Sequence, residues 1–342
     1  MIFSTYLIIS LFLLILINKY FIKNKILINQ TGDSHQKFST KNQVPLTGGI
    51  FILLSILFYL NQYEKIFIIS ILLLFFLGIF SDIKIVKSAS YKVLFQILIA
   101  ASFVYISDLQ LYETRVIFID KLLENYLFNI AFVTFCILIV LNGSNFIDGM
   151  NTLVLGYFLI IVIILFKISY NNNNVIFQIN DHLMTIYFMI ILFFFNIKSK
   201  TFLGDSGTYL IGFLFSTILI KFYLNNPLLS PFLIVLFLWY PCYENLFSII
   251  RKFKLNRSPM DPDKNHLHQL IFLFLRKKFS LSIINANNLT ASSINFFNLI
   301  IFFLASLIPT HTQGIIIYIL LSIFVYSFTY LKLISLKLNK KI

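Results

Sequence analysis

Long apolar runs alternate with short polar segments along almost the whole chain. A helix needs about 20 mostly apolar residues to cross the hydrocarbon core of a bilayer, and most of the runs approach that length. We therefore predict an all-α polytopic membrane protein, with one integral membrane domain over residues 1–342 and about eleven transmembrane helices. The predicted spans are residues 2–22, 46–61, 65–81, 89–107, 126–142, 152–170, 182–197, 206–224, 229–249, 291–309 and 313–333.

Basic residues indicate how these spans are oriented. With the amino terminus outside and the carboxyl terminus in the cytoplasm, most of the 27 Lys and Arg residues fall on the inner side, as the positive-inside rule requires. The first apolar run lacks a basic segment and a small-residue cleavage site, so we expect a retained span rather than a signal peptide. The expected inner loops are residues 23–45, 82–90, 142–151, 198–206 and 250–290. The longest outer loop, 108–125, contains an alternating segment that could form a short hairpin.

Composition supports the membrane assignment and excludes two other classes. Hydrophobic residues make up 59% of the chain and charged residues 12%, against about 45–50% and about 25% in soluble domains. The net charge of +14 is not gathered in a contiguous basic domain, so we expect no nucleic acid partner. Cys136 and Cys242 both lie in apolar runs, which implies no disulfide framework.

The polar stretch 142–151, Asn-Gly-Ser-Asn-Phe-Ile-Asp-Gly-Met-Asn, stands between two apolar runs. Irregular polar backbone at membrane depth is tolerated where protein or a wet cavity covers it. The stretch therefore predicts a covered site that includes Asn142, Asn145, Asp148 and Asn151. Alternatively, its Asn and Asp residues cap the next helix and do nothing else.

Two further carboxylates stand at predicted cytoplasmic helix ends. Asp82 is followed by Lys84, Lys87 and Lys92, which suits a phosphate or Mg²⁺ site, or else a simple surface salt bridge. Asp205 lies between glycines at the start of a long apolar helix, where a hard oxygen ligand stands beside unpaired backbone amides. An N-cap role is the alternative for this second carboxylate.

The largest inner loop carries Arg251, Arg257 and Arg276, three of the four arginines in the chain. The arginine fork suits bidentate recognition of phosphate. His266 and His268 lie in the same loop, but a His-x-His pair without a third ligand is a weak zinc signal. A charged loop that only enforces topology is the alternative.

Together these loops predict separated Asp, Asn, Lys, Arg and His side chains at the cytosolic end of a helical bundle. Mg²⁺ is usually held by one or two carboxylates and substrate phosphates, and phosphoryl transfer depends mainly on positioning and charge neutralisation. A site shared by the cytosol and the inner leaflet indicates one soluble phosphate ester and one lipid as substrates.

The chain resembles the polyprenyl-phosphate N-acetylhexosamine-1-phosphate transferases, which belong to glycosyltransferase family 4. Asn142-x-x-Asn145-x-x-Asp148-Gly149-x-Asn151 is similar to the family's Asn-x-x-Asn-x-x-Asp-Gly motif. Gly204-Asp205-Ser206-Gly207 is similar to its Gly-Asp-Ser-Gly motif. Further similarities lie in Pro45-x-x-Gly48-Gly49 with Lys41, and in the loop from Ser258 to His268, which resembles the N-acetylglucosamine-1-phosphate branch.

This resemblance implies a bacterial plasma-membrane enzyme that uses Mg²⁺, or Mn²⁺, to move a HexNAc-1-phosphate from a UDP-sugar to undecaprenyl phosphate. UMP leaves, and the product initiates a cell-envelope polysaccharide such as an O-antigen, a capsule or a teichoic-type polymer. It implies the following roles: Asp205 and Asn145 as metal ligands; Asp82, Asp148, His266 and His268 as catalytic groups; and Lys41, Lys92, Asn142, Asn151, Arg257 and Asp263 as substrate-binding residues.

Within these roles, the resemblance implies that Asp148 and Asn151 line the nucleotide end and that Asp82 lies near the lipid phosphate. The four groups Lys41, Lys92, His266 and His268 are implied to neutralise phosphate charge.

Three positions depart from the family pattern. The family's Asp-Asp pair is Ser81-Asp82 here, so the first carboxylate is absent. Gln269 replaces a third histidine, and Thr152 stands where glycine is usual. Because of these departures, a catalytically weak homologue that serves as a scaffold is an alternative interpretation. A transporter or flippase for an anionic lipid-linked sugar is a further alternative. A homodimer is a candidate oligomeric state.

Overall fold

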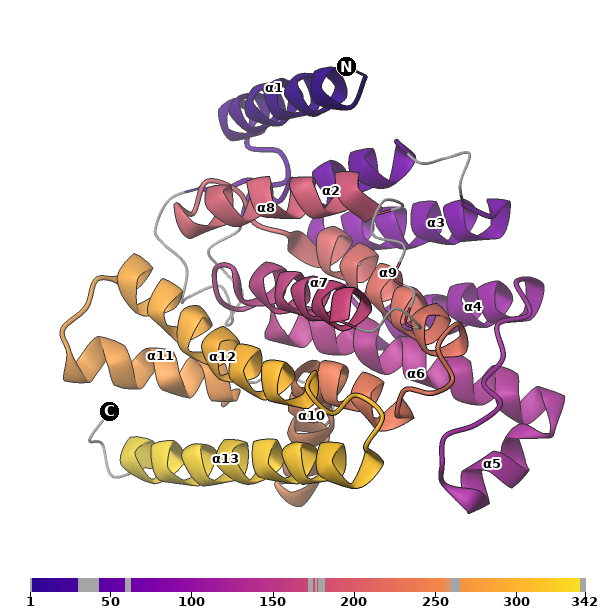
Figure 1. Cartoon of the computed structure of the whole chain (residues 1–342). Coiled ribbons are helices and arrows are strands. Elements are labelled where there is room, and N and C mark those ends of the chain that lie inside the picture. The colour runs from indigo at the N-terminus through magenta and orange to yellow at the C-terminus, as the bar shows by residue number, and fades with distance from the viewer. Residues whose placement is uncertain are drawn as a thin grey trace.

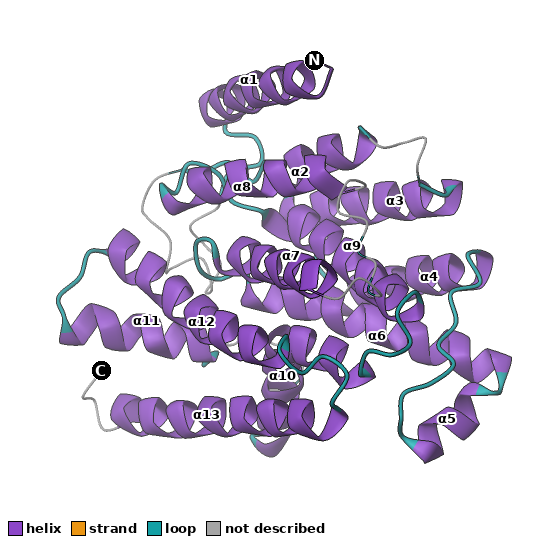
Figure 2. Ribbon diagram, in the orientation of Figure 1, coloured by secondary structure: helices purple, strands orange, loops and turns teal. Residues whose placement is uncertain are grey.

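The computed structural model describes residues 2–29, 43–58, 63–171, 175, 177, 182–256, 258 and 265–338. Within these ranges the chain is helical and contains no β-strand (Figure 2). The helices are α1 (Ile2–Asn24), α2 (Gly48–Leu57), α3 (Lys65–Asp82), α4 (Ala89–Ile106), α5 (Ile117–Leu123), α6 (Tyr126–Ile147), α7 (Leu153–Asn171), α8 (Leu183–Ile197), α9 (Gly204–Leu224), α10 (Pro231–Lys254), α11 (Leu267–Lys278), α12 (Ile283–Ala305) and α13 (Thr312–Leu338).

The predicted all-α polytopic membrane fold is confirmed. Each of the eleven predicted spans coincides with a helix, and nine helices in the described ranges are long and apolar enough to cross a membrane. The two shorter apolar helices are α2, with 10 residues, and α8, with 15. Large apolar side chains such as Phe12 and Phe324 remain 60% and 66% exposed on the outer helices, as expected for surfaces that face lipid.

Three details of the sequence prediction are wrong. The outer segment predicted to form a hairpin contains α5, a short helix that packs against α6. The last inner loop, predicted over 250–290, contains α11, and α12 begins at Ile283 rather than at 291. The polar stretch that begins at Asn142 is helical as far as Ile147, because its polar side chains find partners within the bundle.

Helix α9 lies in the middle of the bundle and packs against α2, α3 and α6 (Figure 1). Sixteen of its 21 residues are buried, whereas the outlying helix α1 is mostly exposed. Residues 206–217 of α9 are all buried, so neighbouring helices surround this part of the helix on every face. The first turn of α9 is therefore held in place by several neighbouring helices at once.

A proline inside α10 leaves one buried backbone carbonyl without its helical hydrogen-bond donor. Pro241 has no N–H, so the carbonyl of Phe237 one turn earlier loses its helical partner. The hydroxyl of Tyr157 on α7 donates to that carbonyl at 2.9 Å. The Phe237 carbonyl thus accepts a hydrogen bond from a neighbouring helix, and α10 continues beyond Pro241 to Lys254.

The polar helix ends gather at one end of the bundle. Helices α9 and α11 begin there, and α3, α6 and α13 end there, whereas α5 lies at the opposite end (Figure 1). The same end carries the segments that the sequence assigns to the cytoplasmic side. This arrangement brings residues far apart in sequence within reach of one another.

Candidate active site

A cavity of about 590 Å³ lies among the polar helix ends. It brings together nine of the twelve site residues that the sequence predicts: Asp82, Lys92, Asn142, Asn145, Asp148, Asn151, Asp205, His266 and His268. The other three, Lys41, Arg257 and Asp263, lie outside the described residues. The remaining wall includes apolar side chains of α4 and α6, so the cavity has both a charged and an apolar part.

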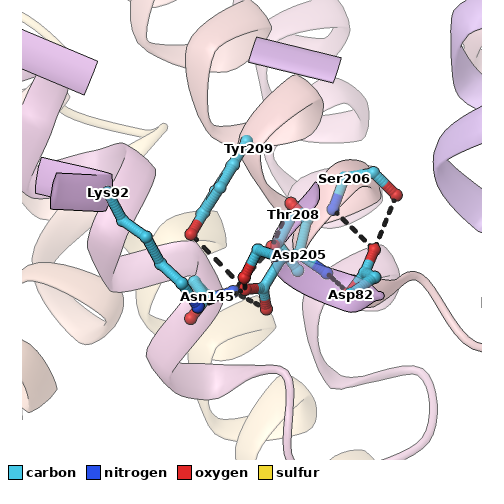
Figure 3. Close-up of polar contacts among 8 residues, drawn as sticks. Asp82, Lys92, Asn145, Asp205, Ser206, Thr208 and Tyr209 are labelled. Carbon is cyan, nitrogen blue, oxygen red and sulfur yellow. Dashed lines mark hydrogen bonds and ion pairs between the residues drawn. The ribbon is translucent and has the colours of Figure 1, made fainter. Parts of the chain in front are cut away.

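Asp205, in the first turn of α9, is the centre of the polar contacts (Figure 3). Its Oδ1 accepts a hydrogen bond from Asn145 Nδ2 at 2.8 Å, and its Oδ2 lies 3.2 Å from Lys92 Nζ. The hydroxyl of Ser81 also donates to Oδ2. Helices α3, α4 and α6 thus each present one donor to the same carboxylate, which fixes its orientation.

Asp82 serves as an N-terminal cap for α9, although it belongs to α3. Its Oδ1 accepts from the backbone N–H of Asp205 at 2.8 Å, and its Oδ2 accepts from the backbone N–H of Ser206 at 3.2 Å and the Ser206 hydroxyl at 3.1 Å. A carboxylate is favourable there because the first amides of a helix have no intrahelical partner and carry partial positive charge. The expected contact of Asp82 with a lipid phosphate stays a prediction.

Gly204 makes this cap possible. Its φ is +69°, in the left-handed region, and a Cβ at this position would stand 2.7 Å from Asp82 Oδ2. Any other residue would be strained and would also push the carboxylate away from the helix start. The Gly204-Asp205 pair is therefore needed for the backbone geometry as well as for its charge.

Asp148 ends α6 and lines the cavity. Burial, together with the nearby carboxylates of Asp205 and Asp82, raises the pKa of Asp148 well above its ordinary value. Three carboxylates in one poorly solvated cavity repel one another unless cations compensate them. Lys92 supplies one positive charge beside Asp205, and a divalent cation would favour the ionised forms of the other two carboxylates.

The turn after Asp148 is held by a group of asparagines. The backbone N–H of Asn151 donates to Asn287 at 2.5 Å, and its side chain donates to Ser199 at 2.9 Å. Thr152, where glycine was expected, has a φ of +64°. Its backbone N–H donates to the side chain of Asn196, which stabilises this left-handed conformation.

Asn142 links two helices of the cavity wall. Its Nδ2 donates to Gln96 Oε1 on α4 at 2.9 Å and to the Leu138 carbonyl at 3.0 Å. The structure therefore gives this residue a bridging contact at the cavity rim. Its predicted contact with substrate stays untested.

The two predicted histidines differ from each other in their surroundings. His266 Nδ1 lies 2.9 Å from Glu244 Oε1, and its ring stacks on His268 at 5.5 Å between centroids. His268 is fully buried, and no described residue hydrogen-bonds either of its ring nitrogens. Burial lowers the pKa of His268 to about 3, so the ring is neutral near pH 7. A neutral imidazole can hydrogen-bond a ligand, whereas the sequence suggested a positive charge.

Sequence reasoning missed several residues of the site. Neither Glu244 nor Lys252 is among the residues that the sequence predicts for the site. Glu244 is fully buried beside His266, and Lys252 is 4% exposed, lines the cavity and lies 5.9 Å from the Phe146 ring centroid. A lone carboxylate inside an apolar run is itself a signal of function, and it could have identified Glu244.

Gln269, which replaces a histidine of the family pattern, has a local structural role. Its Oε1 accepts from the backbone N–H of His266 at 3.4 Å, at the start of α11. It thereby helps to cap that helix, as a Gln three residues after the cap often does.

Asp205 could coordinate a metal ion only together with oxygen atoms of a substrate. Within the described ranges, no group of three or more His, Cys, Asp or Glu side chains could hold a metal ion. The available donors are the hard oxygens of Asp205 and Asn145. Mg²⁺ often takes one or two protein oxygens and completes its coordination with substrate phosphates and water. The donor set therefore fits Mg²⁺ better than a thiolate or imidazole metal.

The fold and site define an integral membrane protein with a charged cavity at one end of its helical bundle. The family description "Glycosyl transferase family 4" matches residues 65–223, which contain Asp82, Asn145, Asp148 and Asp205. This match agrees with the resemblance seen in the motifs of the chain.

Several curated relatives carry related names. An undecaprenyl-phosphate alpha-N-acetylglucosaminyl 1-phosphate transferase of Thermotoga maritima is 35% identical over 21% of this chain and 23% of its own length. A decaprenyl-phosphate N-acetylglucosaminephosphotransferase of Mycolicibacterium smegmatis is 32% identical over 38% of this chain and 37% of its own length. A phospho-N-acetylmuramoyl-pentapeptide-transferase of Dictyoglomus thermophilum is 27% identical over 60% of this chain and 69% of its own length.

The chain thus spans about a quarter to two fifths of the length of the first two relatives.

Proposed function

We propose that the protein transfers an N-acetylhexosamine-1-phosphate group from a UDP-sugar to undecaprenyl phosphate, with release of UMP. The observation that carries this proposal is the cavity in which Asp82, Asp148 and Asp205 meet Lys92 at one end of the bundle. Charged groups suited to a diphosphate and its cation stand there beside an apolar wall suited to a lipid. The names of the relatives support the same reaction class.

Asp205 would hold Mg²⁺, or Mn²⁺, together with oxygens of the donor diphosphate. Asn145 donates from Nδ2 to Asp205, so its Oδ1 is the atom left for the ion. When bound, the cation would neutralise charge on the diphosphate and polarise the phosphoryl oxygens. Lys92 would add a positive charge beside the same carboxylate.

The other residues of the cavity would bind and orient the two substrates. Asp148 and Asn151 would line the nucleotide end, and Asp82 would fix Asp205 through the first turn of α9. The apolar side chains Val93, Phe135 and Leu138 line the cavity and would accept the start of the lipid chain. Exclusion of water by that chain would strengthen the charge interactions at the phosphate groups.

In the proposed direct reaction, an oxygen of the lipid phosphate forms a bond to the phosphorus that carries the sugar. The bond from that phosphorus to the bridging oxygen breaks, and UMP leaves with the electron pair. An ionised phosphate needs no general base, so Ser81 in place of a carboxylate is compatible with turnover. A two-step route through a covalent aspartyl intermediate differs in one respect: it exchanges labelled UMP into UDP-sugar without lipid.

The test is incubation of the purified protein with undecaprenyl phosphate, Mg²⁺ and a panel of UDP-HexNAc donors. The panel holds UDP-N-acetylglucosamine, UDP-N-acetylgalactosamine and a 6-deoxy analogue, and UMP release is measured. We expect release with one donor or more that requires both the lipid and the divalent ion. Absence of UMP with every donor, from folded protein, would refute the proposal.

The second candidate is a homologue with little catalytic power that binds the same lipid as a scaffold. The specific observation in its favour is Ser81, whose hydroxyl, rather than a second carboxylate, faces Asp205. A transporter has less support, because the buried acids of the site gather in one cavity at one end of the bundle. Lipid binding without UMP release, combined with strong activation by Ser81→Asp, would favour the scaffold.

A further inference from the structure

Glu244 is a fully buried carboxylate on α10 with three hydrogen-bond donors around it. Its Oε1 lies 2.9 Å from His266 Nδ1 and 3.3 Å from the backbone N–H of Leu267. Its Oε2 accepts from the Tyr326 hydroxyl at 2.9 Å. One carboxylate thus joins the second half of α10, the first turn of α11 and the middle of α13.

A buried carboxylate of this kind is costly unless its partners are well placed. Removal of a charge from water is unfavourable by several kcal/mol, and hydrogen bonds from donors offset that loss. An ionised carboxylate accepts hydrogen bonds and donates none, so the histidine nitrogen that faces it must carry a proton. The contact therefore selects the ring form of His266 in which Nδ1 is the donor.

Polar side chains of α13 reinforce this contact. Besides Tyr326, the Tyr330 hydroxyl accepts from Arg251 at 3.1 Å, and Lys337 Nζ donates to Asn265 Oδ1 at 2.6 Å. Arg251 in turn donates to the backbone carbonyl of Asn265 at 2.9 Å. The residue immediately before His266 is therefore fixed from the α13 side as well.

The opposite side of His266 belongs to the cavity. His266 lines the cavity, with its ring 5.6 Å from the Phe146 ring and stacked on His268. With Nδ1 engaged by Glu244, Nε2 is the ring atom left for a ligand. The stacking on His268 restricts rotation of the ring about its bond to the chain.

We infer that Glu244, supported by Tyr326, is a positioning residue that keeps the proton of His266 on Nδ1 and directs Nε2 toward the substrate cavity. The inference rests on the proposed function for its catalytic consequence, since Nε2 would meet a phosphate or sugar oxygen of the donor. The geometric part of the inference concerns the protein alone. It can therefore be tested without any substrate.

The first test is the nitrogen-15 spectrum of the protein labelled at histidine in detergent. The chain contains five histidines, and the signal of His266 is identified by its disappearance in His266→Gln. We expect the Nδ1 shift of a protonated ring nitrogen at pH 7.5, as the carboxylate contact requires. An unprotonated Nδ1 in the wild-type protein would overturn the inference, whether or not UMP is ever released.

The second test compares variants across the interface of α10 and α13. Glu244→Gln keeps the size of the side chain but places an amide donor among the three groups that donate to Glu244. We therefore expect the His266 signal to show a mixture of rings protonated at Nδ1 and at Nε2. We expect kcat/KM to fall about tenfold or more, and Tyr326→Phe, which removes one donor, to lower it less. Tyr326→Phe also keeps the test decisive if Glu244→Gln fails to fold.

Tyr243→Phe is the matched control. Tyr243 precedes Glu244 on α10, and its hydroxyl lies 3.2 Å from Ser327 Oγ on α13, so the variant removes a hydroxyl from the same interface without touching Glu244. We expect less than a twofold change in kcat/KM and no change in the His266 signal. An unchanged His266 signal in Glu244→Gln, or equal effects of Tyr326→Phe and Tyr243→Phe, would show that Glu244 is only a structural contact.

Discussion

Gly149 lies directly against His268, so that a Cβ on Gly149 would stand 2.7 Å from His268 Nε2. The ring of His268 is thus confined between the turn that ends α6 and the stacked ring of His266. Two predicted site segments, the one around Asp148 and the one at the start of α11, meet at this contact. The sequence contains both segments but does not reveal that they touch.

Gly149→Ala should lower UMP release at least about tenfold while the protein remains folded. The added methyl group forces either the His268 ring or the backbone of the turn to move, and displacements of about 1 Å at a site of this kind have large kinetic effects. UMP release and a detergent melting curve measure the two outcomes. In a His268→Ala background, Gly149→Ala should cause little further loss of activity. Additive losses from the two substitutions would show that the contact between positions 149 and 268 is not the cause.

His268 should also make the stability of the protein depend on pH. Its pKa is about 3 in the folded protein and about 6.5 when unfolded, so the unfolded chain binds the proton more readily below pH 6.5. Stability should therefore fall as the pH drops through 6.5, by about 2 kcal/mol between pH 7 and pH 5. Comparison of wild type with His268→Gln by denaturant unfolding in detergent isolates this contribution. Equal pH dependence in both proteins would refute it.

Asp205→Asn should lower UMP release at least a hundredfold, because the variant loses the charge that would hold the metal. The measurement is the initial rate as a function of Mg²⁺ concentration. Asp108→Asn, in an outer segment far from the cavity, is the control and should leave the rate unchanged. Near wild-type activity of Asp205→Asn at saturating Mg²⁺ would contradict the metal assignment.

Ser81→Asp should change the rate by less than about tenfold, or 1.4 kcal/mol. The lipid phosphate is already ionised and needs no additional base. A new carboxylate beside Asp205 would also repel the negatively charged phosphate. For the same reason, activity should fall as the pH drops through the second pKa of the phosphate, near 6. A gain of several hundredfold would indicate that the natural protein is a weak catalyst.

Asp82→Asn should be far more damaging than Ser81→Asp. An amide can accept on one side only, so its NH₂ group would face a backbone N–H of the first turn of α9 that Asp82 now satisfies. The position of Asp205 should then change, and UMP release should fall while much of the fold persists. Unchanged UMP release in Asp82→Asn would show that the cap has no influence on the site.

Thr152→Gly should preserve or raise stability, by up to about 1–2 kcal/mol. Thr152 has a φ of +64°, and a residue other than glycine in the left-handed region is disfavoured by about that amount. Loss of the hydroxyl contact to the Asn151 carbonyl at 2.6 Å offsets part of the gain. Melting curves of Thr152→Gly and Thr152→Val provide the comparison. A lower melting temperature for the glycine variant than for the valine variant would contradict the strain.

Several features of the site could be predicted from the sequence because they depend on local pattern. Asp205 between glycines, Asp82 at the end of an apolar run and the Asn-rich stretch after 141 are all visible as polar residues where lipid would penalise them. The resemblance in motif spacing then indicated the family whose model matches residues 65–223. Nine of the predicted site residues indeed line one cavity.

Contacts between distant segments could not be predicted in this way. Nothing local indicates that Asp82 caps a helix more than 120 residues away, or that Glu244 reaches His266 and Tyr326. The hairpin expected at 108–125 was wrong for a related reason, since packing of α5 against α6 overrides a short alternating pattern.

By itself, the sequence determined that the chain forms apolar helices and that its polar groups gather at their ends, because hydrophobic length and periodicity act within each segment. The tertiary structure decided which of those ends meet and in which role. Packing around α9 turned Asp82 into a cap and placed Ser81 and Lys92 on Asp205. Contact of α11 with the turn after α6 buried His268 as a neutral ring. Roles of this kind depend on distance and solvation, which are set by the assembled bundle and by no single segment.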